Sequence, residues 1–339
     1  MTVLAPARRT LGETRSPRIA VLAPCYNEAA TVAQVVADFA RALPGAAIWV
    51  FDNRSTDDTA ARAAAAGALV RQVALKGKGN VVRRMFSDVE ADVYLLVDGD
   101  GTYDAAAAPM LVRRLIDDGL DMVSAARVST EAEAFRAGHR FGNRALSGAV
   151  QMVFGRQFED MLTGYRAFSR RFVKSFPAHS RGFEIETELT VHTLQMRLPA
   201  AEVEAPYGAR PAGSESKLST FRDGWRILRM ISLMVREERP MQFFGIAGLI
   251  SALLAALLAA PVLLGYFQTG LVPRLPTLVV AVGLLVVALL SFACGLILDT
   301  VARARLEQRW LAYLAVEGPE ALTHPEGVTS AAALRPVEG

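Results

Sequence analysis

The sequence predicts an α/β domain with a mostly parallel sheet, followed by an amphipathic helix and two C-terminal transmembrane helices. Three observations support this prediction. Short apolar runs alternate with helical patterns over the first two thirds of the 339-residue chain, as in βαβ proteins. Polar residues follow several of these runs directly. Two long uncharged apolar segments lie in the last third.

The soluble part alternates strands and helices in chain order. Each expected strand is a short apolar run, and each expected helix carries apolar residues at helical spacing. Ser55 or Thr56 is expected to cap the second helix, and Gly67 to close it. The expected strands are residues 18–24, 47–52, 69–72, 92–98 and 121–126, and the expected helices are 29–43, 55–67, 78–89 and 107–118.

Polar residues stand where four of the expected strands end. A single polar strand end is explained by a turn, because Asp, Asn and Gly are common turn residues. Parallel sheets, however, bind ligands at the carboxyl ends of their strands, and four such ends on one edge predict a site. The residues are Asn27 and Glu28, Asp52 and Asn53, Asp98 and Asp100, and Arg127.

Two segments predict a membrane hairpin. Residues 243–267 and 275–298 carry no charge, and each reaches the roughly 20 apolar residues that cross a bilayer. Pro261 is expected to kink the first span. Arginines flank the hairpin at both ends, whereas the connecting loop has only Arg274, so the positive-inside rule predicts that both termini lie in the cytoplasm.

Residues 218–240 carry an apolar stripe at helical spacing, with arginines largely off it. This pattern favours an amphipathic helix on the membrane surface; packing against the soluble domain is the alternative. The expected organisation is a tail over 1–16, a catalytic domain over 17–217, the interface helix over 218–240, a hairpin over 241–300 and a cytoplasmic tail over 301–339.

The net charge, the two cysteines and the first residues of the chain bear on partners and on compartment. A net charge of +3 gives no argument for nucleic-acid binding. Cys25 follows a strand and Cys294 lies in a span, so no disulfide is expected and a reducing compartment fits the soluble part. The first residues lack the apolar core of a signal peptide.

Seven motifs in order resemble the family-2 glycosyltransferases over residues 18–218. More narrowly they are similar to the polyprenyl-phosphate sugar transferases, the group containing dolichol-phosphate mannose synthase. The motifs are "APCYNEAATV", "FDNRSTDDT", "LKGKGNVVRRM", "DGDGTYD", "DMLTGYRAFSR", "GFEIETELT" and "YGARPAGSESKL". The resemblance implies a Rossmann-like, GT-A type fold and a nucleotide-sugar donor, with UDP favoured and GDP possible.

The resemblance also implies a donor and metal site. Asp100 matches the direct ligand of Mg²⁺ or Mn²⁺, Asp98 lies near the ribose and metal, and Thr102 stands where many relatives carry a metal-assisting Gln. Carboxylates together with substrate phosphates are a typical magnesium site. Packing is the alternative for Tyr26, and solvated side chains are the alternative for Lys76 and Lys78. The donor-binding residues implied are Pro24, Tyr26, Glu28, Asp52, Lys78, Asp98, Gly99, Arg210 and Lys217.

The implied acceptor is a polyprenyl phosphate. With a second pKa of about 6 a phosphate monoester is already anionic at neutral pH, so it needs positioning cations rather than a base, and Arg suits phosphate best. Arg127 and Arg140 match the family's acceptor-phosphate arginines. Arg144 is a further candidate, with a surface ion pair as its alternative. In-line attack by the phosphate predicts inversion at the anomeric carbon.

The setting implied is a bacterial cytoplasmic membrane, with the catalytic domain in the cytoplasm and tetramers by analogy with two-span relatives. The sugar and the lipid length are left open. A processive polysaccharide synthase is one alternative; it needs more spans and a Q-x-x-R-W motif, which "LEQRW" does not match. A non-catalytic membrane scaffold is the other, and the retained acidic and basic motif residues argue against it.

Overall fold

The computed structural model describes residues 16–128, 158–182, 184–208, 236 and 239–319. The chain divides into two compact units, and each is taken by itself below. The first unit comprises Met1–Thr220 together with Trp310–Gly339, and the second comprises Phe221–Arg309. The predicted interface helix over 218–240 falls almost wholly outside the described residues, so it stays a prediction.

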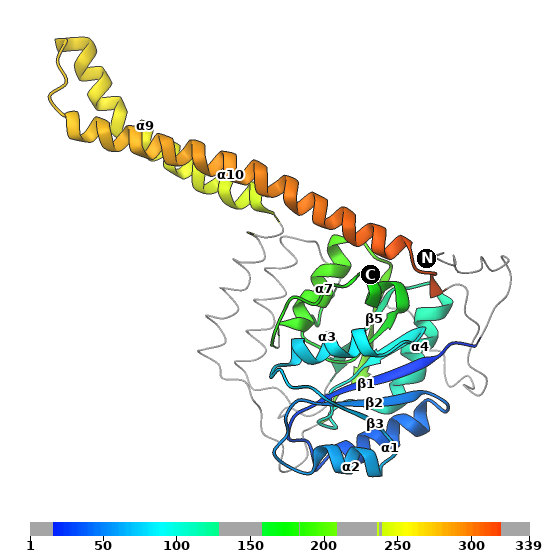
Figure 1. The fold of residues 1–339 in the computed structure, drawn as a ribbon. Helices are drawn as coiled ribbons and strands as arrows, with labels where there is room; N and C mark the ends of the chain where they lie inside the picture. The colour runs from blue at the N-terminus through cyan, green and yellow to red at the C-terminus, as the bar shows by residue number, and fades with distance from the viewer. Residues whose placement is uncertain (1–15, 129–157, 183, 209–235, 237–238, 320–339) are drawn as a thin grey trace, which may run out of the picture. The chain divides into compact units, whose positions relative to one another are not determined.

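The first unit is built on a mixed sheet of seven described strands, in the order β3-β2-β1-β4-β6-β5-β7 (Figure 1). β6 runs antiparallel to both of its neighbours, and the other strand pairs are parallel. The predicted mostly parallel sheet is therefore confirmed. The strands are β1 Ile19–Cys25, β2 Ala47–Asp52, β3 Leu69–Gln72, β4 Val93–Leu96, β5 Met122–Val128, β6 Arg166–Ser169 and β7 Ala200–Pro206.

Helices cover both faces of this sheet. Side chains from α1, α4 and the short helix η1 join one core cluster with Val93 and Leu95 of β4. On the opposite face, Phe86 of α3 contacts Tyr94 of β4, as well as Phe168 and Phe176. Successive strand residues point to opposite faces, so β4 is buried on both sides. The helices of this unit are α1 Val32–Ala42, α2 Thr59–Ala65, α3 Lys78–Asp88, η1 Ala105–Ala107, α4 Ala108–Asp117, α6 Arg170–Ser175 and α7 Ile185–Gln195.

The five strands and four helices expected from the sequence are present in the expected order, with ends shifted by a few residues. The patterns did not predict β6 or β7. β6 is only four residues long and contains Arg166, which reads as polar in a sequence pattern. β7 alternates Glu202 and Glu204 with small residues, which gives a weak apolar signal. Both strands are specified by their neighbours in the sheet rather than by their own sequence.

The predicted cap of α2 is wrong. Helix α2 begins at Thr59, and its N-cap Asp58 makes no side-chain capping hydrogen bond; Asp57 Oδ1 accepts the backbone N–H of Thr59 at 3.1 Å. Ser55 instead accepts a hydrogen bond from the Asn27 backbone N–H at 2.9 Å, and Thr56 donates its backbone N–H to Asn27 Oδ1 at 2.8 Å. The two hydroxyl residues therefore join the loops after β1 and β2. Asn27 has a φ of 54°, a conformation that Asn tolerates better than most residues.

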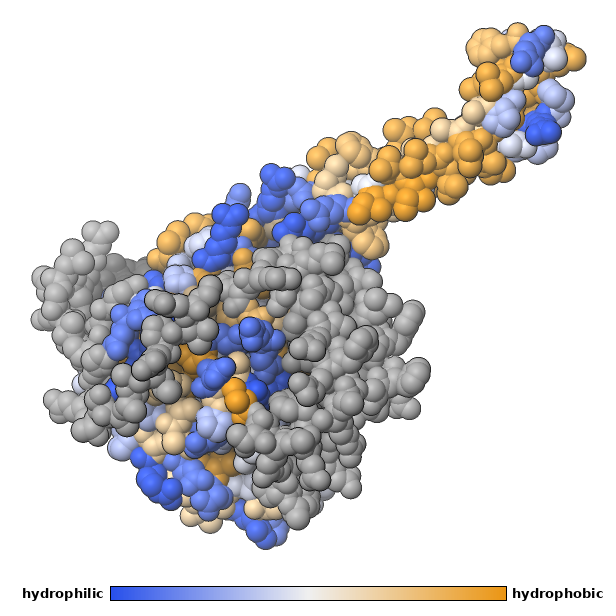
Figure 2. Space-filling model, turned by 180° about the vertical axis from the view of Figure 1, so that it is seen from behind, coloured by the Kyte–Doolittle hydropathy of each residue, from blue (hydrophilic) through white to orange (hydrophobic). Residues whose placement is uncertain are grey.

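The second unit contains helix α9, Pro240–Thr269, and most of helix α10, Leu275–Leu314. Both helices are long and apolar enough to cross a membrane. Much of their apolar surface is exposed, as Figure 2 shows in orange. α9 contains Pro261 and bends in its second half (Figure 1). α10 continues past the predicted end of the span, so the expected tail over 301–339 is helical as far as Leu314; no Gly or Pro interrupts residues 296–317.

Small residues form the contact between α9 and α10. Gly248, Ala255 and Val262 are buried on α9, and Ala281, Ala288 and Gly295 are buried on α10. Each set is spaced by seven residues, which is the repeat of a helix-packing seam. A Cβ added to Gly248 would lie 3.1 Å from the Ala288 carbonyl oxygen. Small residues of this kind let helix backbones approach closely in a bilayer.

Replacing Gly248 by Leu is expected to lower the midpoint of heat unfolding in detergent, because the new side chain must push the helices apart. Overpacking of this kind costs about 1–3 kcal/mol. Gly245→Leu is the matched control, since a Cβ there meets nothing within 4 Å in the part of the chain that the structure describes, and the substitution gains the same helix propensity. Circular dichroism of both purified variants measures their midpoints of heat unfolding. Equal midpoints would contradict the prediction that Gly248 lies in the contact between α9 and α10.

Candidate active site

The predicted site lies at the ends of the neighbouring parallel strands β1 and β4. From this pair the strand order continues to β2 and β3 on one side and to β6, β5 and β7 on the other. Open α/β sheets bind ligands at such a switch point, outside the carboxyl ends of the strands. The two strand ends are in close contact. A Cβ added to Gly99 would lie 2.4 Å from Cys25 Sγ, and the Thr31 hydroxyl donates to the Gly99 carbonyl oxygen at 2.7 Å. Gly99 is therefore required by the approach of the β1 end to the β4 loop.

Asp100 is held by Thr102. The backbone N–H and the hydroxyl of Thr102 donate to Asp100 Oδ1 at 3.2 and 2.6 Å, and both residues are buried. In this arrangement the hydroxyl proton of Thr102 points to the carboxylate of Asp100. Thr102 therefore orients Asp100, and its predicted role as a metal ligand stays a prediction.

Asp98 contacts Lys78, the first residue of α3. Lys78 Nζ also lies 2.6 Å from Glu186 Oε1, and its side chain is only 9% exposed. The alternative that Lys78 is a solvated surface lysine is therefore wrong. Glu186 lies in the first turn of α7; it belongs to the motif "GFEIETELT", but the sequence did not predict a place for it in the site.

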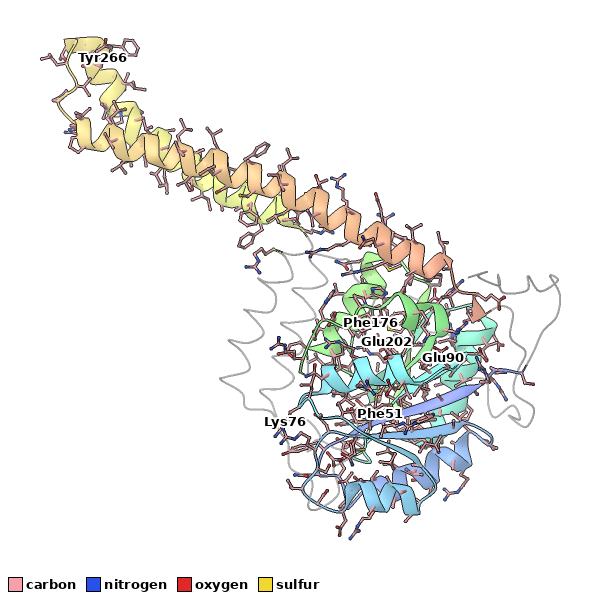
Figure 3. The ribbon with its side chains drawn as sticks, viewed as in Figure 1. Phe51, Lys76, Glu90, Phe176, Glu202 and Tyr266 are labelled. Atoms are coloured by element: carbon pink, nitrogen blue, oxygen red, sulfur yellow. The ribbon has the colours of Figure 1, made fainter. Side chains whose placement is uncertain are left out.

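Lys76 behaves differently from Lys78. Its Nζ lies 4.5 Å from the centroid of the Tyr26 ring and donates to the Tyr26 hydroxyl at 3.1 Å. Lys76 lies at the edge of the domain, where Figure 3 labels it. Simple core packing therefore does not describe Tyr26, which follows β1 with its ring beside a cation. Its role in holding a base stays a prediction.

The loop after β2 is built by buried polar residues. Asp52 is 2% exposed and accepts from the Ser55 backbone N–H at 3.3 Å through either oxygen. The Asn53 amide donates to the carbonyl oxygens of Val73 and Leu75, and its oxygen accepts from the Gly77 N–H at 2.7 Å. Asn53 therefore ties the end of β2 to the start of α3, and Glu28 donates its backbone N–H to Thr59 at 2.9 Å.

Gly77 is fixed by its surroundings. Its φ is +121°, and an added Cβ would lie 2.2 Å from the Arg181 carbonyl oxygen. Only glycine adopts this conformation readily. The close approach brings the segment before α7 against the start of α3, and so brings Glu186 to Lys78.

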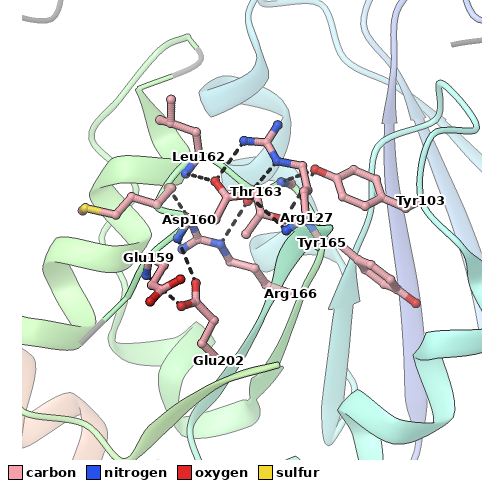
Figure 4. Close-up of polar contacts among 11 residues, drawn as sticks. Tyr103, Arg127, Glu159, Asp160, Leu162, Thr163, Tyr165, Arg166 and Glu202 are labelled. Carbon is pink, nitrogen blue, oxygen red and sulfur yellow. Dashed lines mark hydrogen bonds and ion pairs between the residues drawn. The ribbon is translucent and has the colours of Figure 1, made fainter. Parts of the chain in front are cut away.

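Arg127, at the end of β5, is paired with Asp160. Its Nε and Nη2 donate to the two carboxylate oxygens at 2.6 and 2.9 Å (Figure 4). Its guanidinium carbon lies 5.4 Å from the centroid of the Tyr207 ring. Glu202 of β7 holds the backbone of this pair in place. Its carboxylate accepts hydrogen bonds from the backbone N–H groups of Glu159 and Asp160 at 2.7 and 3.0 Å. Arg127 is therefore a rigidly oriented cation whose charge is partly offset.

This ion pair should give a pH-dependent contribution to stability. Burial alone would raise the pKa of Asp160, but the hydrogen bonds and charge of Arg127 outweigh it and lower that pKa. A carboxyl with a lowered folded-state pKa stabilises the fold above its unfolded pKa, about 3.9, and loses this contribution as the pH falls through the folded value. We expect Asp160→Asn to cost about 3–5 kcal/mol near neutral pH.

The cost of Asp160→Asn should shrink progressively as the pH falls below about 4, because the unfolded chain then binds a proton at Asp160 that the folded protein binds only at lower pH. Denaturant unfolding of both proteins from pH 3 to 7 measures the difference. Glu159→Gln is the control, because Glu159 is exposed and no side-chain hydrogen bond of it is found among the described residues. A cost that does not change with pH would contradict this account.

Arg166 and Tyr103 are site residues that sequence reasoning missed. Arg166 is fully buried in β6 and donates to the carbonyl oxygens of Met161 and Thr163 at 2.7 and 3.1 Å. The Tyr103 hydroxyl accepts from the Gly164 N–H at 2.8 Å. Together they fix the loop over 160–164, which carries Asp160 at one end and contacts Asp98 at the other. The signal was present: a charged Arg inside the apolar run "GYRAF" needs buried partners.

A Cβ added to Gly164 would lie 2.4 Å from Asp98 Oδ2. The carboxylate is thus clamped between the Gly164 backbone and Lys78. The predicted site residues that the structure describes lie at the carboxyl ends of the strands, in the loops that follow them, or at the start of α3: Pro24, Tyr26, Glu28, Asp52, Lys78, Asp98, Gly99, Asp100, Thr102 and Arg127. Arg140, Arg144, Arg210 and Lys217 lie outside the described residues.

The donor set suits a divalent metal that shares its shell with a substrate. Within the described ranges, no group of three or more His, Cys, Asp and Glu side chains gathers to hold a metal. Asp98 and Asp100 supply carboxylates one residue apart at the end of β4. Mg²⁺ binds in this way, through one or two carboxylates together with waters and substrate phosphates.

The chain is similar to known glycosyltransferases. The family model for glycosyl transferase family 2 matches residues 20–176. Glycosyltransferase AglJ of Haloferax volcanii is 36% identical over 235 residues, which cover 69% of this chain and 77% of the relative. A dolichyl-phosphate hexose transferase of the same organism is 30% identical over 221 residues, covering 65% of this chain and 95% of the relative.

A solved structure has the same fold. Glucosyl-3-phosphoglycerate synthase from Mycobacterium tuberculosis, in complex with Mn²⁺, UDP-glucose and phosphoglyceric acid, aligns with a TM-score of 0.53 at 25% identity. The alignment covers 65% of this chain and 79% of that protein. The mostly parallel sheet, with acidic residues in the loop after β4, is thus that of a nucleotide-sugar transferase. The matched motifs, the length of the similarity to its relatives and this fold show that the chain is a glycosyltransferase and belongs to glycosyl transferase family 2.

Proposed function

We propose that the protein transfers a sugar from a nucleotide-sugar donor, with inversion, to the phosphate of a membrane polyprenyl phosphate. The observation that carries this proposal is the pair of exposed apolar helices attached to a nucleotide-sugar transferase domain. Such helices suit an enzyme whose acceptor is a lipid. The relative named dolichyl-phosphate hexose transferase supports the same class of acceptor.

On the donor side, Asp100 and Asp98 would hold Mg²⁺ or Mn²⁺. A bound divalent ion neutralises the charge of the leaving diphosphate. Thr102 keeps Asp100 in one orientation, and Lys78 with Gly164 does the same for Asp98. The nucleotide is expected against Pro24, Tyr26, Glu28 and Asp52, with UDP favoured, as in the solved structure that contains UDP-glucose.

On the acceptor side, Arg127 orients the lipid phosphate. Its Nε and Nη2 donate to Asp160, and among the described residues no side-chain hydrogen bond of its Nη1 is found, so Nη1 is proposed to bind a phosphate oxygen. The phosphate is already anionic, so the chain needs no general base. Its oxygen forms the new bond to the anomeric carbon as the bond to the nucleoside diphosphate breaks, and attack from the opposite face gives inversion. Arg140 and Arg144 are proposed to assist, and Arg210 and Lys217 to bind the donor diphosphate.

The proposed setting is the cytoplasmic membrane of a bacterium, with the catalytic domain and both termini in the cytoplasm. Arginines flank the outer ends of both apolar segments, residues 243–267 and 275–298, which is the distribution expected of cytoplasmic flanks. Tetramers are proposed only by analogy with two-span relatives.

The test uses the purified full chain in detergent with Mn²⁺, undecaprenyl phosphate and radiolabelled UDP- and GDP-sugars. We expect label from one donor to move into the organic phase, with release of the nucleoside diphosphate. Phosphoglyceric acid is the competing acceptor, because the solved relative contains it. Transfer to it alone, or no transfer from any donor, would overturn the proposal; long polymers would instead indicate a processive synthase.

A further inference from the structure

Lys78, Asp98 and Glu186 form a buried cluster of charges beside the proposed metal site. Lys78 Nζ contacts Asp98 Oδ1 and lies 2.6 Å from Glu186 Oε1. The side chains of Lys78 and Glu186 are 9% and 6% exposed, whereas that of Asp98 is 28% exposed. Asp98, which lies two residues before Asp100, is therefore the most exposed member of the cluster.

Two hydrogen-bonding positions in this cluster have no partner among the described residues. Glu186 Oε2 is buried and accepts no hydrogen bond there. A lysine ammonium has three donors, and within the same residues Lys78 uses two of them, on Asp98 and Glu186. Burial raises the pKa of Glu186, more than the charge of Lys78 lowers it. A buried polar atom without a hydrogen-bond partner lowers the stability of the fold, so Glu186 Oε2 points to a partner that binds beside it.

The chemistry of the two open positions restricts what can bind. A divalent cation would be repelled by the Lys78 ammonium, and a phosphate would be repelled by two carboxylates. A hydroxyl group both donates and accepts, so a single hydroxyl can satisfy Glu186 Oε2 and the third Lys78 donor together. In a nucleotide sugar the ring that bears such hydroxyls is bonded directly to the diphosphate.

We propose that Lys78, Asp98 and Glu186 form the subsite for the transferred sugar, with Glu186 accepting a hydrogen bond from a ring hydroxyl and Lys78 donating to it. The inference rests on the proposed function only in taking the donor to be a nucleotide sugar. It is independent of the acceptor. Glu186 is then a residue that selects among sugars by the position of one hydroxyl.

The test compares donor binding with and without the sugar. Titration calorimetry measures the affinity of the full chain, in detergent with Mn²⁺, for UDP, GDP, UDP-glucose, UDP-galactose, UDP-N-acetylglucosamine and GDP-mannose. Glu186→Gln keeps the shape of the side chain but removes its charge. We expect this variant to bind the preferred nucleotide sugar about tenfold more weakly and the matching nucleoside diphosphate equally well. Glu184→Gln, at the exposed N-cap of α7, should change neither affinity.

Deoxy analogues of the preferred donor locate the hydroxyl. One of them should bind equally to the wild type and to Glu186→Gln, because the contact is already absent. Equal weakening of nucleotide and nucleotide sugar would overturn the subsite and assign the cluster a purely structural role. If Glu186→Gln bound both the nucleotide and the nucleotide sugar as tightly as the wild type, water rather than a ring hydroxyl would fill the subsite, and the proposal would also be overturned. Since no acceptor is present, failure of lipid transfer leaves this result standing, whereas a wild type that binds no nucleotide sugar refutes both proposals.

Discussion

Replacing Asp100 by Asn is expected to reduce sugar transfer about a thousandfold. Asp100 is the buried carboxylate at the end of β4 that Thr102 holds in place. A metal held there contributes several kcal/mol to neutralising the leaving diphosphate, and about 4 kcal/mol corresponds to a thousandfold in rate. The measurement is the initial rate of transfer as a function of Mn²⁺ concentration.

Two further results make this prediction specific. Asp104→Asn is the matched control, because Asp104 lies in the same loop but accepts a hydrogen bond from the Ala106 backbone N–H and is exposed. Its rate should stay within about twofold of the wild type. Thermal unfolding should show that Asp100→Asn still folds. Unchanged transfer by this variant at low Mn²⁺ would remove Asp100 from the metal site.

Gly164→Ala is expected to lower transfer about a hundredfold while the protein still folds. The new Cβ would lie 2.4 Å from Asp98 Oδ2, so the carboxylate must leave its contact with Lys78. Overpacking at such a site costs about 1–3 kcal/mol of stability, and a misplaced catalytic group can cost about 100-fold in rate. The kinetic measurement is the initial rate at saturating donor and metal.

Gly208→Ala is the matched control for Gly164→Ala. Among the described residues, a Cβ at Gly208 would meet only the Thr102 carbonyl oxygen, at 3.8 Å, which is an ordinary contact. This variant should keep nearly full activity. A Gly164→Ala protein that transfers sugar at the wild-type rate would show that the clamp on Asp98 has no part in the reaction.

Sequence patterns predicted the first half of the fold because its information is local. Strands β1 to β5 are apolar runs, and the helices between them repeat their apolar residues at helical spacing. Sequence patterns did not predict β6 and β7, because their neighbours in the sheet, rather than their own residues, decide their conformation. The prediction for the cap of α2 was wrong because Ser55 and Thr56 form hydrogen bonds with Asn27, which is distant in sequence.

The candidate site divides in the same way. The sequence by itself determined the family motifs, the acidic residues after β4 and the two apolar helices, since these depend on residue type and spacing along the chain. Only the tertiary structure decided that Asp160 pairs with Arg127, that Gly164 and Lys78 clamp Asp98, and that Glu186 faces Lys78. These contacts join residues 20 to 108 positions apart, and no local pattern encodes the closure of such loops.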